Sequence, residues 1–393
     1  MRAPAAARRV VVTGLGVVSP AGTGAEAFWA GLRTAPTDRQ QRRADDFDPT
    51  AWLPPREARR ADRFTQLALA AGQMAMDDRG PAPLPDPGRC GVHLGTGMGG
   101  VSTLEVQVGV LAERGPGRVS PFTIPMVMPN AGAAALSLRF GLQGPCETIT
   151  TACAAGTHSL AAGARLVADG RCDLVLAGGA ESLMTPTSTA AFSIMRALSP
   201  SGRSRPFDAA RDGFCLSEGA AVLVLEDREA ALARGARVHG EVLGAASTSD
   251  AHHVTAPAPG GSGAGACMRL ALEDAELTTS DVRAVNAHGT STPLNDAAEG
   301  AAITTVFGPG GVPVSGIKGV TGHSLGAAGA LEAVSVLLSF AARELPPTLG
   351  TADVDPALEL DVVLEPRAWE PGPTLSNSFG FGGHNGCLVL GPA

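Results

Sequence analysis

Short runs of β-branched and apolar residues alternate with alanine- and leucine-rich stretches along the whole chain, and this alternation restricts the possible folds. Strand-like composition occurs at residues 10–13, 90–94, 147–150, 174–177, 220–225, 241–246, 282–286, 312–315 and 387–390. Helix-like composition occurs at residues 64–76, 154–168, 267–275, 296–306 and 327–342. Strands that alternate with helices form βαβ units, in which helices cover both faces of a buried sheet. The sequence therefore predicts an α/β protein of two halves that divide near residue 241.

Composition excludes several classes of protein. The chain has 393 residues, of which 44% are apolar and 17% are charged, as expected of a globular protein with a sizeable core. Its net charge of −8 speaks against general binding to nucleic acid or anionic membranes. Seven cysteines without a CxxC pair indicate reduced thiols rather than disulfides or a zinc site. The apolar run near the N-terminus is interrupted by Thr13, Gly14 and Gly16, so we expect a first buried strand and a cytoplasmic protein.

Cys153 lies where one predicted strand meets the helix that follows it. The run Cys146-Glu-Thr-Ile-Thr-Thr-Ala gives way at this cysteine to an alanine-rich stretch. A thiol at such a junction faces unpaired backbone N–H groups and the positive end of the helix dipole, which favour the nucleophilic thiolate. A small buried residue in a tight turn is the alternative, because free cysteines are commonly buried. This segment alone leaves both interpretations open.

Two histidines lie in the same kind of place. His288 follows a short apolar strand and precedes a Gly-Thr-Ser-Thr turn, and His323 lies in a glycine-rich loop that opens a helix. Ligands of open α/β sheets bind at the carboxyl ends of strands, so these histidines and Cys153 are candidates for one site. Lys318, five residues before His323, is the only lysine of the chain. An ammonium is a compact charge with a tunable pKa, so we include Lys318 in the candidate site.

Four segments resemble the elongating β-ketoacyl-acyl-carrier-protein synthases, in the order found in that family. They are Thr151-Ala-Cys-Ala-Ala-Gly, Asn286-Ala-His-Gly-Thr-Ser-Thr, Lys318-Gly-Val-Thr-Gly-His-Ser-Leu-Gly-Ala-Ala-Gly-Ala-Leu-Glu and Asn377-Ser-Phe-Gly-Phe-Gly-Gly-His-Asn-Gly. The resemblance runs almost from end to end of the chain. It implies the thiolase fold, a five-layer α/β/α/β/α sandwich of two similar βαβ halves, here residues 8–241 and 242–391. It also implies a dimer, either of two copies or with a related ketosynthase-like subunit.

The same resemblance implies roles for single residues. Cys153 matches the nucleophile that accepts an acyl chain from an acyl-carrier-protein thioester. His288 and His323 match the histidines that promote decarboxylation of malonyl-carrier protein. Two imidazole N–H donors suit that step, because loss of CO2 leaves an enolate oxygen that needs stabilising. Lys318 matches the lysine beside these histidines, and Glu332 matches its acidic partner.

Further positions match the surfaces on which the family binds its substrates. Backbone N–H groups of Cys153 and Phe381 match an oxyanion hole, and the Phe381 ring matches a pocket gate, with packing in a glycine-rich turn as its alternative role. Thr290, Thr292 and Thr255 match the channel for the phosphopantetheine arm, although ordinary turn formation also explains threonines here. The resemblance requires no metal and no cofactor of the protein's own, because the acyl carrier protein brings the phosphopantetheine.

Four arginines precede the helix predicted to begin near residue 64. Arg56, Arg59, Arg60 and Arg63 fall at near-helical spacing on an otherwise acidic protein. Such a cluster fits docking of an acidic carrier protein. A solvated helix end is the alternative, because exposed charges commonly have no partner.

Some positions depart from the housekeeping fatty-acid synthases and leave the substrate open between a fatty-acyl and a polyketide chain. Asn295 and the run Ser217-Glu-Gly-Ala resemble catalytic ketosynthase subunits of type II polyketide systems, and His384 replaces the usual threonine. A non-catalytic chain-length-factor partner is one alternative function, against which Cys153 argues. A thiolase is another, with Cys387 as the only candidate for its second cysteine. A priming synthase would pair its cysteine with one histidine and one asparagine.

Overall fold

The computed structural model describes residues 8–36 and 38–393. Its main sheet has the strand order β12-β10-β9-β14-β15-β8-β1-β7-β6-β4-β5. These strands are β1 (Val10–Ser19), β4 (Cys90–Gly95), β5 (Cys146–Ile149), β6 (Leu174–Ser182), β7 (Leu216–Asp227), β8 (Gly240–Ser249), β9 (Ala284–Asn286), β10 (Pro313–Ser315), β12 (Asp361–Val362), β14 (Thr374–Gly380) and β15 (His384–Gly391). Four short strands complete the pairing: β2 (Gly22–Thr23) on β1, β3 (Gln41–Arg42) on β7, and β11 (Glu344–Leu345) with β13 (Arg367–Ala368).

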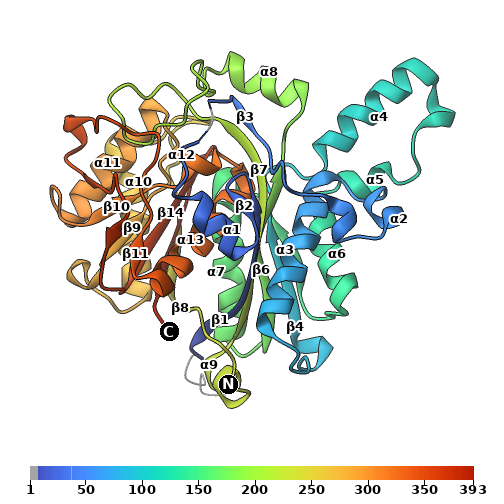
Figure 1. Ribbon diagram of the computed structural model, residues 1–393, viewed down its shortest axis with the longest axis horizontal. Helices are drawn as coiled ribbons and strands as arrows, with labels where there is room; N and C mark the ends of the chain where they lie inside the picture. Colours follow the sequence, from blue (N-terminus) through green and yellow to red (C-terminus); the bar gives the residue numbers. More distant parts are fainter. Residues whose placement is uncertain (1–7, 37) are drawn as a thin grey trace.

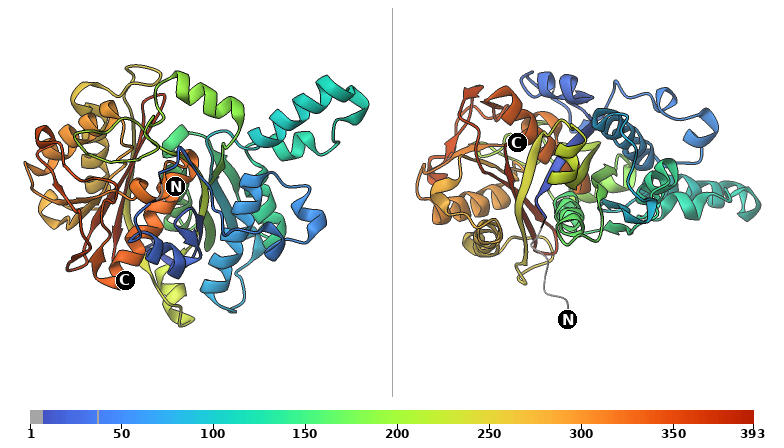
Figure 2. Two further views of the ribbon diagram at one scale, coloured as in Figure 1. Left: turned by 45° about the horizontal axis from the view of Figure 1, so that its top comes forward. Right: turned by 90° about the horizontal axis from the view of Figure 1, so that it is seen from below.

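The helices form three layers around two halves of this sheet (Figures 1 and 2). Helices α7 (Ala155–Ala168) and α13 (Ala328–Ala342) lie in the middle, in contact with strands of both halves. Helices α3 (Arg63–Arg79) and α6 (Ala131–Phe140) cover the first half, and α10 (Ser262–Asp274) and α11 (Pro293–Phe307) cover the second. The remaining helices are α1 (Ala25–Gly31), α2 (Pro55–Ala58), α4 (Val101–Arg114), α5 (Thr123–Val127), α8 (Pro186–Ile194), α9 (Arg228–Ala233) and α12 (Lys318–Thr321). The result is the expected five-layer α/β/α/β/α sandwich.

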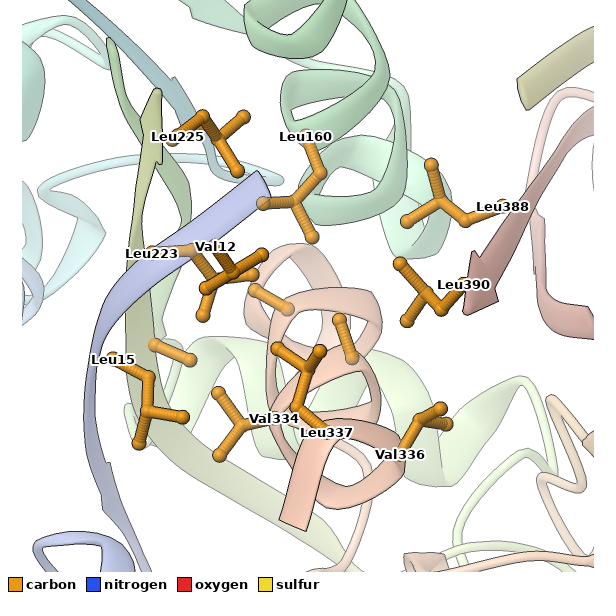
Figure 3. Packing of buried hydrophobic residues seen from close by; sticks show 14 of the residues in the cluster. Val12, Leu15, Leu160, Leu223, Leu225, Val334, Val336, Leu337, Leu388 and Leu390 are labelled. Atoms are coloured by element: carbon orange, nitrogen blue, oxygen red, sulfur yellow. The ribbon is translucent and has the colours of Figure 1, made fainter. Parts of the chain in front are cut away.

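Apolar side chains from both halves of the sheet meet on the two central helices. In Figure 3, Leu223 of β7 and Leu390 of β15 lie on either side of Leu160 from α7 and Leu337 from α13. Burial from all sides explains why the stretch Leu325–Ala342 is long and apolar enough to cross a membrane, since 83% of it is buried inside the protein. We interpret this stretch as the central core helix of the sandwich.

The two halves are continuous at one strand pair. The first three residues of β1 pair with β8, and β8 pairs along most of its length with β15. The predicted boundary between residues 241 and 242 falls inside β8, and it stays a prediction. Every predicted strand and helix overlaps an observed element, whereas β14, α8 and the excursion from α4 to α6 were not predicted.

Parallel pairing brings the carboxyl ends of several strands to one edge. Strand β4 is parallel to β5, and β9 is parallel to both β10 and β14. Cys153 follows β5, His288 follows β9, and Lys318 and His323 follow β10. The topology therefore places all four residues where open α/β sheets bind their ligands.

Candidate active site

A tight turn presents Cys153 between β5 and α7. The turn is a short 3-10 helix, Ala152–Ala154, and Ala152 has a left-handed φ of 49°, which is uncommon for a residue other than glycine. Cys153 is only 5% exposed, and its sulfur lines a cavity of about 370 Å³. Such local strain is typical of residues that present a functional group.

The thiol itself is not stabilised as a thiolate. Burial raises the pKa of Cys153 to about 12, although the Lys318 charge and the backbone N–H groups of Phe381 and Cys153 lower it. For the pKa of this thiol, burial therefore outweighs the effect expected from the helix terminus. The proton of Cys153 has to leave during the reaction, and a neighbouring base is required.

His323 lies within hydrogen-bonding distance of the thiol. Its Nε2 atom lies 3.1 Å from the Cys153 sulfur. Burial and the Lys318 charge hold the pKa of His323 well below its usual value, so the resting ring is neutral. The backbone of His323 is fixed by β7, since its N–H donates to the Cys215 carbonyl (2.8 Å) and its carbonyl accepts from the Ser217 N–H (3.1 Å).

His288 lies beside His323 and is oriented by Lys318. The two imidazole rings are 5.4 Å apart and nearly perpendicular, at 84°. The Lys318 Nζ atom lies 3.3 Å from His288 Nδ1 and 2.5 Å from the His288 carbonyl oxygen, and it also contacts Glu332. Because the ammonium donates to Nδ1, the proton of the neutral His288 ring sits on Nε2. Burial, then Lys318 and His323, hold the pKa of His288 well below its usual value.

Glu299 is a buried carboxylate beside the His288 loop that the sequence did not single out. Its two carboxylate oxygens each accept a backbone hydrogen bond of 2.7 Å, from His288 and from Gly289. Burial raises the pKa of Glu299 to about 7 against these hydrogen bonds. Its place eleven residues after His288 gives no local signal of this contact, because a sequence does not reveal which acidic side chains are buried. Glu299 fixes the loop that carries His288.

The cavity has a polar side and an apolar side. Thr255, Thr290 and Thr292 line the polar side, and the hydroxyls of Thr290 and Thr292 are 2.9 Å apart. Thr292 also caps α11, because its side chain accepts a hydrogen bond from the Asn295 N–H. The structural role given as the alternative for this threonine is therefore present. The apolar side comes from residues 192–197 and neighbouring segments: Phe192, Met195, Ala197, Phe214 and Leu325, together with Arg196.

Phe381 and Cys387 lie differently with respect to this cavity. Phe381 lines it, and its backbone N–H lowers the pKa of the Cys153 thiol. Cys387 is fully buried, its thiol donates to the Asn377 side chain (3.3 Å), and it is absent from the cavity lining formed by the described residues. Cys387 is therefore not placed to act as the second cysteine of a thiolase.

The arginine cluster divides into exposed and structural members. Arg56, Arg59 and Arg60 are exposed, and Arg56 and Arg60 line a second hollow of about 630 Å³ between α2, α3 and α6. Arg63 instead donates to Glu218 (2.8 Å), whose side chain is fully buried, and lies over the Phe47 ring. Arg63 thus has a structural role that leaves its guanidinium turned inward.

Comparisons with known proteins agree with this geometry. Models described as the beta-ketoacyl synthase N-terminal and C-terminal domains match residues 34–231 and 239–352. The 3-oxoacyl-[acyl-carrier-protein] synthase 2 of Synechocystis sp. is 42% identical, with 98% of each chain covered. A solved ishigamide ketosynthase/chain length factor structure has a TM-score of 0.92 and 35% identity, covering 99% of this chain and 100% of the other.

A second solved structure extends the comparison. It is a type II polyketide synthase acyl-carrier protein in complex with its ketosynthase bound to the hexaketide, with a TM-score of 0.88, 29% identity, and coverage of 98% and 100%. These likenesses confirm the thiolase fold expected from the sequence. With both family models matched in order, the chain belongs to the β-ketoacyl synthase family.

Proposed function

We propose that the protein is a β-ketoacyl-acyl-carrier-protein synthase. It joins an acyl chain held on Cys153 to the two-carbon unit of malonyl-carrier protein, and it releases CO2 and a 3-oxoacyl-carrier protein. One observation carries this proposal: the Cys153 sulfur and a ring nitrogen of each of His288 and His323 lie within 4.8 Å of one another in one cavity.

The first step is acyl transfer to Cys153. The sulfur attacks the thioester carbon of the acyl-carrier protein, and His323 Nε2 accepts the thiol proton at 3.1 Å. The backbone N–H groups of Cys153 and Phe381 stabilise the oxyanion of the tetrahedral intermediate. His323 then gives the proton to the departing carrier sulfur, so the chain ends as a thioester on Cys153.

The second step is decarboxylation of the malonyl thioester. Cleavage of the bond to the carboxylate releases CO2 and leaves an enolate, whose oxygen accepts hydrogen bonds from the two imidazoles. His288 donates from Nε2 in the tautomer that Lys318 fixes. His323 Nδ1 has no hydrogen-bond partner among the described residues, so its ring can change tautomer and donate from Nε2. The enolate carbon then attacks the Cys153 thioester, forming the new carbon–carbon bond and freeing the sulfur, which takes up a proton.

The polar side of the cavity receives the carrier's phosphopantetheine arm. Thr290, Thr292 and Thr255 offer hydroxyls along it, and this arm supplies the only prosthetic group that the proposed chemistry needs. The seven cysteines are free in the described chain, which suits a reducing cytoplasm, where we place the reaction.

The apolar side of the cavity is proposed to hold the acyl chain. Each carbonyl of a poly-β-ketone buried among Phe192, Phe214 and Leu325 would lose its hydrogen bonds to water, at a cost of about 1–3 kcal/mol. We therefore expect chains without internal carbonyls to be the better substrates. Equal kcat/KM values for matched hydrocarbon and poly-β-ketoacyl carriers would contradict this assignment.

We expect the exposed arginines to bind the acidic carrier protein. The double substitution R59E/R60E should raise the KM for acyl-carrier protein about tenfold and leave kcat unchanged, because these side chains act before the chemistry. The increase should shrink in high salt, since exposed charges are screened. Steady-state kinetics at two salt concentrations measure both effects, with R283E as a control at another exposed arginine. An unchanged KM in the double variant would remove this surface from the proposal.

A second ketosynthase-like chain is the proposed structural partner. The excursion formed by α4 and α5 projects from the body in Figure 1 and carries apolar side chains that are 46–68% exposed: Leu104, Val106, Val108, Leu111 and Ile124. The neighbouring β5 lies at the edge of the sheet. An open strand beside an apolar surface favours pairing with another protein. Light scattering should give twice the 39.5 kDa mass of one chain, alone or with a chain-length-factor subunit, and a persistent monomer would contradict the proposal.

The deciding assay uses acyl-carrier and malonyl-carrier protein together. The proposal predicts equal amounts of CO2 and 3-oxoacyl-carrier protein. Decarboxylation with no condensation would favour a chain-length-factor role, and a strict requirement for acyl-coenzyme A would favour a priming synthase.

A further inference from the structure

Glu181 is a buried carboxylate beside the catalytic residues that none of the proposed steps uses. It lies near the end of β6 and is 0% exposed. Its Oε1 atom accepts from the Thr96 hydroxyl (3.1 Å), and its Oε2 atom accepts from the backbone N–H groups of Gly97 and Gly326 (3.3 Å for Gly326). One side chain thus joins the loop after β4 to the turn before α13.

The turn that contains Gly326 forms part of the cavity lining beside Cys153. It is a 3-10 helix, Leu325–Ala327, which begins two residues after His323. Leu325 is a left-handed residue with a φ of 48°, and its side chain packs in the same cluster as Cys153 and lines the cavity. A shift of this turn would therefore move both the wall beside the sulfur and the segment that carries His323.

The backbone of this turn packs closely against the neighbouring segments. A Cβ atom built at Gly156 would lie 2.9 Å from the Gly326 carbonyl oxygen, and one built at Gly97 would lie 2.7 Å from Glu181 Oε2. These backbones meet without side chains between them, apart from Glu181. Its carboxylate supplies a polar link among segments that pack closely at Gly97, Gly156 and Gly326.

The charge of Glu181 also acts on the nucleophile. It raises the pKa of Cys153, in the same direction as burial and opposite to Lys318. Burial raises the pKa of Glu181 itself to about 7, although the amides of Gly97, Gly326 and Met98 favour its ionised form. The groups that face Cys153 are thus Glu181, Lys318 and the two neutral histidines.

We propose that Glu181 is a positioning residue for Cys153 and His323, a buried anion that ties the Thr96–Gly97 loop to the Gly326 turn beneath the nucleophile. The inference rests on the proposed function, because it takes Cys153 as the acyl acceptor.

Two substitutions separate the effect of the Glu181 hydrogen bonds from the effect of its negative charge. E181A removes both, and we expect kcat for condensation to fall about 10- to 100-fold, as small displacements of catalytic groups cause. E181Q removes only the charge, because the amide oxygen can accept from Gly97 and Gly326 while its N–H donates to Thr96. We expect E181Q to stay within about threefold of the wild type in kcat. E181M keeps most of the side-chain volume but cannot accept these hydrogen bonds, so a purely space-filling role predicts wild-type kcat for E181M, whereas we expect it to lose as much as E181A.

The pH dependence of alkylation reports on the charge. Above pH 7 the wild-type Glu181 is ionised and disfavours the thiolate, so E181Q should react with iodoacetamide about three to ten times faster at Cys153. Below about pH 6 the wild-type carboxyl is protonated, and the ratio of the two rates should approach one. Peptide mass spectrometry measures the rate at Cys153.

A control substitution separates the effect of the Glu181 charge from the effect of neutralising any buried carboxylate. E226Q neutralises another buried carboxylate, which is paired with Arg79 (3.1 Å) at the far end of β7, and it should leave the Cys153 ratio at one. The inference would be overturned if the ratio of Cys153 alkylation rates in E181Q and the wild type did not change with pH. Wild-type turnover in a folded E181A would overturn it too. Should E181A not fold in circular dichroism, the E181Q profile decides alone. A wild-type protein that is never acylated at Cys153 would instead refute the proposed function.

Discussion

The C153A variant is expected to lose carbon–carbon bond formation by about 10⁴-fold or more and still decarboxylate malonyl-carrier protein. The alanine cannot hold an acyl chain, so the electrophile of the second step is never formed. The oxygen of the malonyl thioester still meets His288 and His323, whose backbones are fixed by Glu299 and by β7 rather than by the sulfur. The two half-reactions should therefore separate in one variant.

Release of CO2 and formation of 3-oxoacyl product, followed in parallel, measure this separation. C172A is the matched control, because Cys172 is buried in the core outside the cavity lining, and it should retain both activities. Condensation by C153A at the wild-type rate would show that another group carries the chain.

The H288A variant is expected to show the opposite pattern. Decarboxylation should fall about 10²- to 10³-fold, because the enolate loses the donor that Lys318 holds in one tautomer. Acylation of Cys153 should stay within about threefold of the wild type, since its base is His323, 3.1 Å from the sulfur.

Single-turnover acylation and CO2 release on the same preparation test this expectation. H93Q is the control, because His93 is buried on β4 and lies outside the cavity. Equal losses in both half-reactions of H288A would mean that His288 supports the structure of the site rather than the enolate.

Much of this fold is predictable because strand and helix composition alternate clearly. The junction before Cys153 and the glycine loop before α13 follow from local sequence alone, and the structure places both at the edge where the sheet ends meet. The excursion formed by α4 and α5 was not predicted, because its apolar residues are exposed in the single chain rather than buried in a periodic core face. Strand β14 was missed because Thr374-Leu-Ser-Asn-Ser is polar for a buried strand.

The sequence predicts which residues meet in the candidate site, but it does not predict how burial changes their pKa values. Cys153, His288, His323 and Lys318 meet as the motifs imply, but burial reverses the expected effect on the thiol. The inward turn of Arg63 toward Glu218 depends on two positions 155 residues apart, which helical spacing cannot reveal. Glu181 and Glu299 carry no local signal, because their roles come from backbone amides of other segments.

Trapping the acyl-enzyme and then chasing it gives the most direct test of a shared site for the sulfur and the two imidazoles. The protein is loaded from acyl-carrier protein, the adduct is mapped by peptide mass spectrometry, and malonyl-carrier protein is added. The account predicts one acyl group on Cys153 that disappears as an equal amount of 3-oxoacyl-carrier protein forms, with the chase blocked in H288A. An acyl group on any other residue, or an adduct on Cys153 that the malonyl substrate never consumes, would contradict it.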